Sequence, residues 1–313
     1  MRDAPRIGAV AIYDRAIVRL LPAVPRPVVR RISGRYIAGT ELEDAVDTVS
    51  ALNHGGMLAT VDVLGEEISS ADEARAIAGA YLDVLATIER ERLGANVSVK
   101  LTALGLKLDL DLARELLEQV VADARDRDTF VRIDMEDSST TDDTLALYRG
   151  LRGAGYDNVG VVLQAYMRRT RADIEALADL RPNVRLCKGI YVEPPEIAFR
   201  DDEQVRASFV RSLEQLLDTG SYVGIATHDE WLIRRSLEQV AQRKLAEDAY
   251  EFQMLLGVRE ERRDQLVRAG HRLRVYVPFG SHWYEYSVRR LQENPSIAGY
   301  IAGDTIRRLL ALR

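Results

Sequence analysis

Eight short apolar segments recur along this chain, and a longer stretch with helical periodicity follows nearly every one of them. The segments show little alternation of apolar and polar residues, which is typical of parallel strands covered on both faces. Eight such units in 313 residues predict an α/β fold of the (β/α)8 TIM-barrel type. The predicted strands are Met57–Leu64, Asn96–Leu101, Phe130–Met135, Val159–Ala165, Val184–Lys188, Tyr222–Thr227, Tyr250–Leu255 and Leu273–Val277.

The stretches between the strands carry helix start and stop signals. Ser70 and Glu73 have capping-box spacing, and Gly153 follows a helical period as a usual stop. No linker or low-complexity tract is visible, so residues 1–313 are predicted to form one domain, with a helical arm at 1–40 and the barrel and active-site helix at 57–294. The predicted helices are Glu41–Asn53, Ser70–Leu93, Asp109–Arg125, Asp142–Gly153, Arg171–Leu180, Glu203–Asp218, His228–Lys244, Arg259–Ala269 and Glu285–Leu291.

Charged and aromatic residues gather where the predicted strands end. A barrel of this type carries its active site at the carboxyl ends of its strands. Taken singly, each such residue is more often a solvated or paired structural group, but their convergence on one mouth predicts an enzyme site. They are Glu66, Lys100, Asp134, Gln164, Arg185, Lys188, Tyr191, His228, Gln253 and Tyr276.

The helix predicted after the eighth strand adds two arginines near that mouth. Tyr286 and Arg290 are four residues apart and share a helix face, and Glu293 follows Arg290 by three residues. The adjacent Arg289 and Arg290 form a pair suited to a carboxylate or phosphate ligand. A surface helix with ordinary salt bridges is the alternative.

Composition and missing motifs narrow the class of function. The net charge of −6 argues against a dedicated nucleic-acid binder, and the single cysteine, Cys187, excludes an intramolecular disulfide. The four histidines have no metal-binding spacing, so no metal site is predicted, and no Rossmann glycine motif, P-loop or nucleophile elbow is found. The residues alone therefore indicate an anion-binding barrel that acts on a small acid, by an unspecified reaction.

Residues 1–35 differ from the rest of the chain. They contain eight arginines and two aspartates, with apolar residues between them and prolines that break the segment into short helices. Such a segment suits either an anionic membrane surface or a helical arm packed on the barrel. No signal peptide is visible and no apolar run reaches the roughly 20 residues that span a bilayer. The expected location is the cytoplasm, with peripheral attachment to the inner face of the membrane as an option.

Eight strings of the sequence, in order, resemble proline dehydrogenases of the monofunctional bacterial type. They are VSVKLTALG, RIDMEDS, VLQAYMRRT, VRLCKGIY, IATHD, YEFQMLLG, RVYVPFG and YSVRRLQEN, within residues 36–294. The resemblance implies a distorted (β/α)8 barrel with N-terminal helices. It also implies FAD-dependent oxidation of L-proline to Δ1-pyrroline-5-carboxylate, by hydride transfer from proline C5 to flavin N5, as the first step of proline catabolism to glutamate. A membrane quinone then accepts the electrons, and a pyrroline-5-carboxylate dehydrogenase is a potential partner.

The resemblance also implies roles for single residues. Lys100, Arg289 and Arg290 would hold the proline carboxylate, with Asp134 orienting these cations. Tyr276, Tyr286 and Leu255 or Leu256 would line the substrate pocket, and the size of Tyr276 favours proline over 4-hydroxyproline. Glu66 would close over the substrate by pairing with Arg289. Arg185 would approach flavin N5. The other implied FAD contacts are Gln164, Lys188, Gly189, Tyr191, Thr227, His228 and Glu293.

One departure from the family pattern and two rival functions stay open. Ile190 and Val192 flank Tyr191 where relatives often carry alanine and tryptophan, which leaves the adenylate side of the FAD site less defined. The first rival is an aldolase-type barrel in which Lys100 or Lys188 forms a Schiff base with the substrate. The second is a barrel that binds a small molecule without turning it over.

Overall fold

The computed structural model describes residues 34–65, 68–284 and 286–287 of the chain. Four predicted site residues, Glu66, Arg289, Arg290 and Glu293, lie outside these ranges, and so does nearly all of the predicted N-terminal arm. Of the predicted last helix, Glu285–Leu291, the structure describes only Tyr286 and Ser287.

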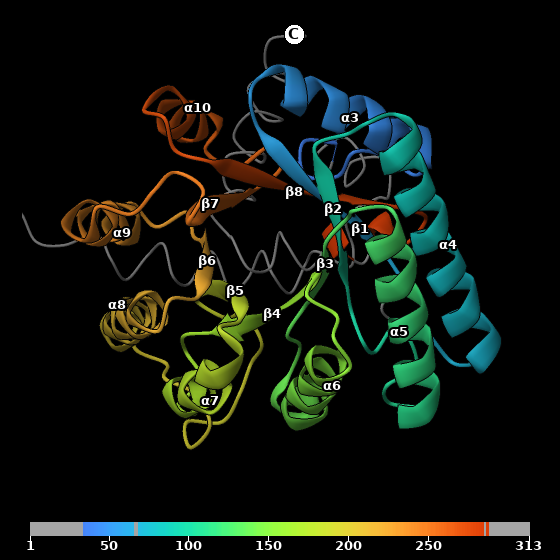
Figure 1. The fold of residues 1–313 in the computed structure, drawn as a ribbon, viewed down its shortest axis with the longest axis horizontal. Coiled ribbons are helices and arrows are strands. Elements are labelled where there is room, and N and C mark those ends of the chain that lie inside the picture. The colour runs from blue at the N-terminus through green and yellow to red at the C-terminus, as the bar shows by residue number, and fades with distance from the viewer. Residues whose placement is uncertain (1–33, 66–67, 285, 288–313) are drawn as a thin grey trace, which may run out of the picture.

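Eight parallel strands close into a barrel in sequence order, β1 to β8 (Figure 1). Closure is made by β8 pairing with β1, with Val61 opposite Val277, so the barrel predicted from the apolar segments is confirmed. The strands are β1 Leu58–Val63, β2 Ala95–Val99, β3 Val131–Ile133, β4 Val159–Gln164, β5 Asn183–Cys187, β6 Tyr222–Ala226, β7 Tyr250–Leu255 and β8 Leu273–Phe279.

Helices surround the strands and cover their outer faces (Figure 1). Their apolar sides meet the outward-facing residues of the sheet, and this layer between sheet and helices is the main hydrophobic core. The α-helices are α3 Leu42–His54, α4 Ala71–Arg90, α5 Leu110–Asp126, α6 Thr141–Gly153, α7 Thr170–Leu177, α8 Asp202–Asp218, α9 Glu230–Arg243 and α10 Glu260–Arg268, with short 3-10 turns at Ser138–Thr140 and Ala178–Leu180.

Helix α3 gives the barrel its irregular feature. It precedes β1 in the chain and packs against both β8 and β1 (Figure 1). In a regular barrel the helix that follows the last strand covers this seam. Because α3 already fills that position, the structure agrees with a distorted barrel.

Capping side chains set where two helices near the site begin. Ser70 caps α4, because its hydroxyl accepts a hydrogen bond from the backbone N–H of Glu73, as the capping pattern predicts. Helix α9 begins at Glu230, two residues later than predicted, since the carboxylate of Asp229 caps it by accepting from the N–H of Trp231. His228 therefore lies in the loop after β6 instead of in the first turn of the helix.

The interior of the barrel is polar and charged. Branched aliphatic side chains dominate the interior of an ordinary barrel. Here, inward-facing side chains form hydrogen bonds from strand to strand: Thr60 donates to Asn96, and Arg132 donates to Asn183. Small residues make room for these long side chains. A Cβ atom added at Gly160 would lie 2.4 Å from Nη1 of Arg132. The barrel interior is therefore built as a hydrogen-bonded scaffold that leads up to the mouth.

Candidate active site

Lys100 and Asp62 form the deepest ion pair of the mouth. The Lys100 ammonium lies 2.8 Å from both carboxylate oxygens of Asp62, whose side chain is fully buried. The same ammonium donates to the hydroxyl of Tyr276 at 3.1 Å. Tyr81, on α4, approaches Asp62 from outside the barrel with its hydroxyl 3.3 Å away. Lys100 is thus held in one place as a charged group.

Asp134 is the centre of the site. Its Oδ1 accepts from Arg185 Nη1 at 2.6 Å and from the Ser98 hydroxyl at 2.7 Å. Its Oδ2 accepts from the Tyr276 hydroxyl at 3.1 Å and lies 3.7 Å from the Lys100 ammonium. Burial acts to raise the pKa of Asp134, but the two cations and these hydrogen bonds outweigh it and hold the pKa below its usual value. The carboxylate is therefore ionised and orients both cations.

Tyr276 lies close to both cations. Its ring centroid is 5.3 Å from the Arg185 guanidinium carbon and 5.9 Å from the Lys100 nitrogen. Burial, followed by the charges of Asp134 and Asp62, raises its pKa well above the usual value, so the hydroxyl keeps its proton. Tyr286 is buried close by, in a cluster with Ile37, Leu64 and Trp283.

Hydrogen bonds hold the Arg185 guanidinium at two of its nitrogens, Nε and Nη1. Asp134 and Ser98 accept hydrogen bonds from its Nη1, and the side-chain oxygen of Gln253 accepts from its Nε at 2.6 Å. These bonds fix the plane of the guanidinium as well as its position, because Nε and Nη1 donate from different edges of the planar group.

A second group of predicted residues lies along the ends of β4, β5 and β6. Gln164 donates its amide N–H to the carbonyl of Glu136 at 2.8 Å. The Lys188 ammonium lies 2.6 Å from Asp229, which also binds Arg206. Burial acts to raise the pKa of Asp229, but hydrogen bonds from Arg206 and Lys188 prevail and lower it to about 2.

Two further members of this group are fixed by the loops. His228 accepts a hydrogen bond from the N–H of Leu255 at its Nε2, so a neutral ring carries its proton on Nδ1. Gly189 has a φ of 103°, and a Cβ atom there would meet the Tyr166 ring at 2.0 Å. Glycine is required at this position because backbone conformation and space both exclude a side chain. Thr227 accepts from the N–H of Asp229, and Tyr191 is partly buried in the loop after β5.

The structure thus divides the described site residues into two adjoining groups. Lys100, Asp134, Arg185, Tyr276 and Tyr286 gather at the centre, whereas Gln164, Lys188, Gly189, Tyr191, Thr227 and His228 follow the rim from β4 to β6. The two candidate pocket leucines, Leu255 and Leu256, face different ways at the end of β7. Leu255 has the orientation that a pocket residue would need, and its role stays a prediction. It shares the inward-facing register of Glu251 and Gln253 on β7, whereas Leu256 packs against the outer core.

Sequence reasoning gave no role to Asp62, Ser98 or Glu251, and it placed Gln253 at the mouth without naming its partner. All four residues support the central group. A signal was present for Ser98 and Glu251, since they lie two residues before Lys100 and Gln253 in the sequence. Residues two apart on a strand share a face. In the part of the chain that the structure describes, no cluster of histidine, cysteine, aspartate or glutamate could hold a metal ion, and no helix is long and apolar enough to cross a bilayer.

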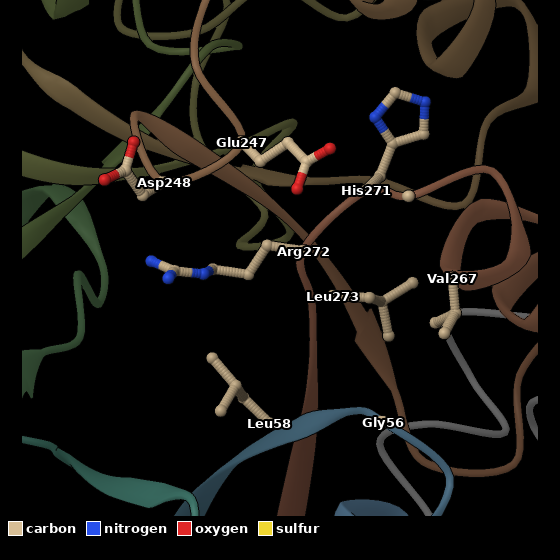
Figure 2. Close-up of a pocket in the computed structure, with 9 residues that line it drawn as sticks. Gly56, Leu58, Glu247, Asp248, Val267, His271, Arg272 and Leu273 are labelled. Atoms are coloured by element: carbon tan, nitrogen blue, oxygen red, sulfur yellow. The ribbon is translucent and has the colours of Figure 1, made fainter.

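An open depression lies at the other end of the barrel, beside the beginnings of β1 and β8 (Figure 2). None of the predicted site residues lines it. Because barrel enzymes place their chemistry at the carboxyl ends of the strands, we do not assign it as the active site. Its lining residues are Gly56, Leu58, Glu247, Asp248, Val267, Gly270, His271, Arg272 and Leu273.

Comparison with known proteins identifies the family. The sequence profile of the proline dehydrogenase family matches residues 45–302. Proline dehydrogenase 1 of Bacillus subtilis (strain 168) is 38% identical over 274 residues, covering 88% of this chain and 90% of the relative. Proline dehydrogenase of Deinococcus radiodurans is 35% identical over 308 residues, covering 95% of this chain and 98% of the relative. The chain belongs to the proline dehydrogenase family.

The resemblance inferred from the eight strings is thereby confirmed, and the protein is an enzyme of the proline dehydrogenase class. Solved structures agree on the fold. Proline utilization A (PutA) from Bdellovibrio bacteriovorus, inactivated by N-propargylglycine, superposes with a TM-score of 0.80 at 23% identity. That match covers 90% of this chain and 36% of the PutA chain, so this chain spans about a third of that longer protein.

Proposed function

We propose that this proline dehydrogenase oxidises L-proline to Δ1-pyrroline-5-carboxylate, with FAD as its cofactor and a membrane quinone as the final electron acceptor. The observation that carries the proposal is the set of contacts made by Asp134 at the centre of the site. Its carboxylate contacts one ammonium, one guanidinium and the hydroxyl of a half-buried tyrosine, at the mouth of a barrel whose sequence belongs to this family.

Substrate binding follows from the charges of the central group. An amino acid brings a carboxylate, and Lys100 is a fixed cation at the mouth that can accept it. By resemblance, Arg289 and Arg290 supply the rest of the clamp. Cations around the carboxylate also disfavour a protonated substrate amine, which helps because hydride loss needs the lone pair of the neutral nitrogen. Tyr276 supplies the apolar wall on which the proline ring packs.

The donor set along the rim fits FAD. Gln164 and Arg185 offer a planar amide and a planar guanidinium, which match the polar edge of a flavin ring, and Lys188 offers an ammonium for a pyrophosphate. Gly189 lets the backbone turn closely at that point. FAD, when bound, supplies a hydride acceptor for proline C5. Arg185 would stabilise negative charge on the reduced ring, and Thr227, His228, Tyr191 and Glu293 would complete the contacts.

The aldolase reading is disfavoured by the lysine environments. A Schiff-base lysine needs a neutral amine, which requires a lowered pKa. Lys100 binds both oxygens of Asp62 and Lys188 binds Asp229, so each amine would have to leave an ion pair before it could attack a carbonyl. The bleaching test described below distinguishes an enzyme from a barrel that binds a small molecule without turning it over.

Proline-dependent bleaching tests the proposal. The purified protein should be yellow, with flavin absorption at about 450 nm, and anaerobic L-proline should bleach that band. The variant Lys100→Met should keep the colour but need far more proline to bleach. A protein that stays colourless after incubation with FAD, or a yellow protein that proline leaves unbleached, would overturn the assignment.

The membrane partner is proposed for residues 1–35, which lie almost entirely outside the described residues. Their arginines could attract anionic lipid by about 1 kcal/mol each, placing a cytoplasmic enzyme on the inner face of the membrane beside its quinone. Co-sedimentation with anionic liposomes at low and high salt, with and without residues 1–35, tests this. Equal sedimentation of both forms would refute it. A pyrroline-5-carboxylate dehydrogenase is the proposed consumer of the product.

A further inference from the structure

Two inward-facing residues of β7 form a hydrogen-bonded line that ends on Arg185. The side-chain oxygen of Gln253 accepts from Arg185 Nε at 2.6 Å, and its amide nitrogen donates to Glu251 Oε1 at 2.5 Å. Arg274, on β8, donates from its Nε to the same Glu251 oxygen at 2.8 Å. The line therefore runs from the lower barrel interior to a cation of the active site, entirely through buried or nearly buried groups.

The chemistry of the line fixes the direction of the Gln253 amide. A carboxylate accepts hydrogen bonds but has none to donate, so the amide must turn its NH2 group toward Glu251. The amide oxygen is then left facing the guanidinium of Arg185, which can only donate. Arg274 keeps Glu251 ionised. Burial acts to raise the pKa of Glu251, but Arg274 and the hydrogen bonds it accepts hold that pKa below its usual value.

Packing fixes the amide a second time. Gly224, on the neighbouring strand β6, lies directly against the end of the Gln253 side chain. A Cβ atom there would be 2.4 Å from the Gln253 amide nitrogen and 2.9 Å from its amide carbon. The backbone of Gly224 has no positive φ, so the glycine is explained by this close approach alone.

We infer that Gln253 and Glu251 are positioning residues that set the plane of the Arg185 guanidinium for the redox reaction. The inference rests on the proposed function, in which Arg185 stabilises the reduced flavin. Asp134 and Ser98 hold one edge of the guanidinium, and Gln253 holds the other. Without Gln253, the remaining bonds to Nη1 act as a pivot about which the guanidinium can rotate.

The principal test is Gln253→Met, which keeps the length and charge of the side chain but removes both hydrogen bonds. We expect kcat for L-proline to fall by about tenfold, the cost of one lost hydrogen bond to a charged group, with KM changing less than twofold. The flavin midpoint potential should shift downward, because a rotating cation stabilises the reduced ring less. Gly224→Ala, which pushes the amide aside without removing it, should change both quantities in the same direction.

A charge-balanced rescue makes the test specific. The double variant Glu251→Gln with Gln253→Glu returns an acceptor to Arg185 Nε and keeps the total charge. Its kcat and flavin midpoint potential should therefore lie much closer to the wild-type values than those of Gln253→Met. Glu238→Gln, on the exposed face of α9, is the matched control and should change neither.

The inference is overturned if folded, flavin-loaded Gln253→Met has wild-type kcat and midpoint potential, or if the double variant recovers neither. Failure of the proposed function looks different. There, proline would not bleach the wild-type flavin at all, while the midpoint potentials would still report whether Gln253 acts through Arg185.

Discussion

The Lys100 ammonium is chelated by Asp62, with 2.8 Å to each carboxylate oxygen. The pair lies at the carboxyl ends of the adjacent strands β1 and β2, and Asp62 is excluded from solvent. A buried pair of this kind contributes less to stability than its geometry suggests, because both charges lose their hydration. Its value in this site is that it holds a cation in a fixed place for an incoming carboxylate.

Removing Asp62 alone should lower the free energy of unfolding more than removing both Asp62 and Lys100. In Asp62→Leu the buried Lys100 ammonium loses its bidentate carboxylate partner, and we expect the free energy of unfolding to fall by about 3 kcal/mol. The double variant with Lys100→Met removes both charges and should recover at least half of that loss. Urea denaturation of the three proteins measures this. A double variant less stable than Asp62→Leu would contradict the account.

Tyr276 should control which ring the site accepts. Its half-buried side chain contacts Lys100, Arg185 and Asp134, so shortening it should open space beside the proline ring. Tyr276→Ser should lower kcat/KM for L-proline and raise the ratio of 4-hydroxyproline to proline turnover by about tenfold, the scale of one pocket contact. Tyr276→Phe keeps the ring and is the matched control, and its ratio should stay near that of the wild type.

Two glycine-to-alanine variants should change the stability of the fold in opposite directions. Gly189→Ala forces a Cβ into the Tyr166 ring at a backbone φ of 103°, so we expect a loss of about 2 kcal/mol or more of stability and weaker FAD retention. Gly150→Ala lies in helix α6 with nothing within 4 Å of the added Cβ, and should gain about 0.5 to 1 kcal/mol. Thermal unfolding and the flavin-to-protein absorbance ratio report both effects.

Asp229 should contribute stability that acid removes. Its pKa is lowered to about 2 in the folded protein, so the contribution is complete above about pH 5 and is lost as the pH falls toward 2. Relative to Asp229→Asn, the wild type should have about 2 kcal/mol of extra stability at pH 6, and about half of it at pH 3. The control is Asp72→Asn, measured over the same pH range, since the Asp72 side chain is almost fully exposed.

Glu66 carries a prediction from family resemblance alone, because it lies outside the described residues. If it closes over the substrate by pairing with Arg289, Glu66→Ala should raise KM for L-proline several-fold and leave kcat less affected. Steady-state kinetics with an artificial electron acceptor would show this. An unchanged KM would remove the proposed gate.

Much of the site could be located from the sequence because strand ends are local features. Lys100 and Asp134 come directly after β2 and β3, so the chain itself marks them, and the barrel rule then brings them to one mouth. Arg185 is marked differently, as a lone charge inside the apolar strand β5. Leu255 shows the limit of this approach. A shift of one residue reverses the face of a strand, and without the observed register both Leu255 and Leu256 were admissible.

The support of the site could not be read in the same way. The bonds from Asp62 to Lys100 and from Gln253 to Arg185 join residues 38 and 68 positions apart. Gly224 carries no hint in the sequence that its missing side chain makes room for Gln253 on another strand. Such partners depend on the register between strands, and no periodicity within a single strand encodes that register.

The sequence by itself determined the eight strand–helix units, the family and the end of the barrel where charge collects, because hydrophobic periodicity and motif strings are properties of short stretches. The tertiary structure alone decided which cation each carboxylate holds, that α3 covers the seam between β8 and β1, and that the barrel interior is a polar scaffold. Those outcomes depend on closure of the sheet, which brings side chains that are distant in the sequence within hydrogen-bonding distance inside the barrel.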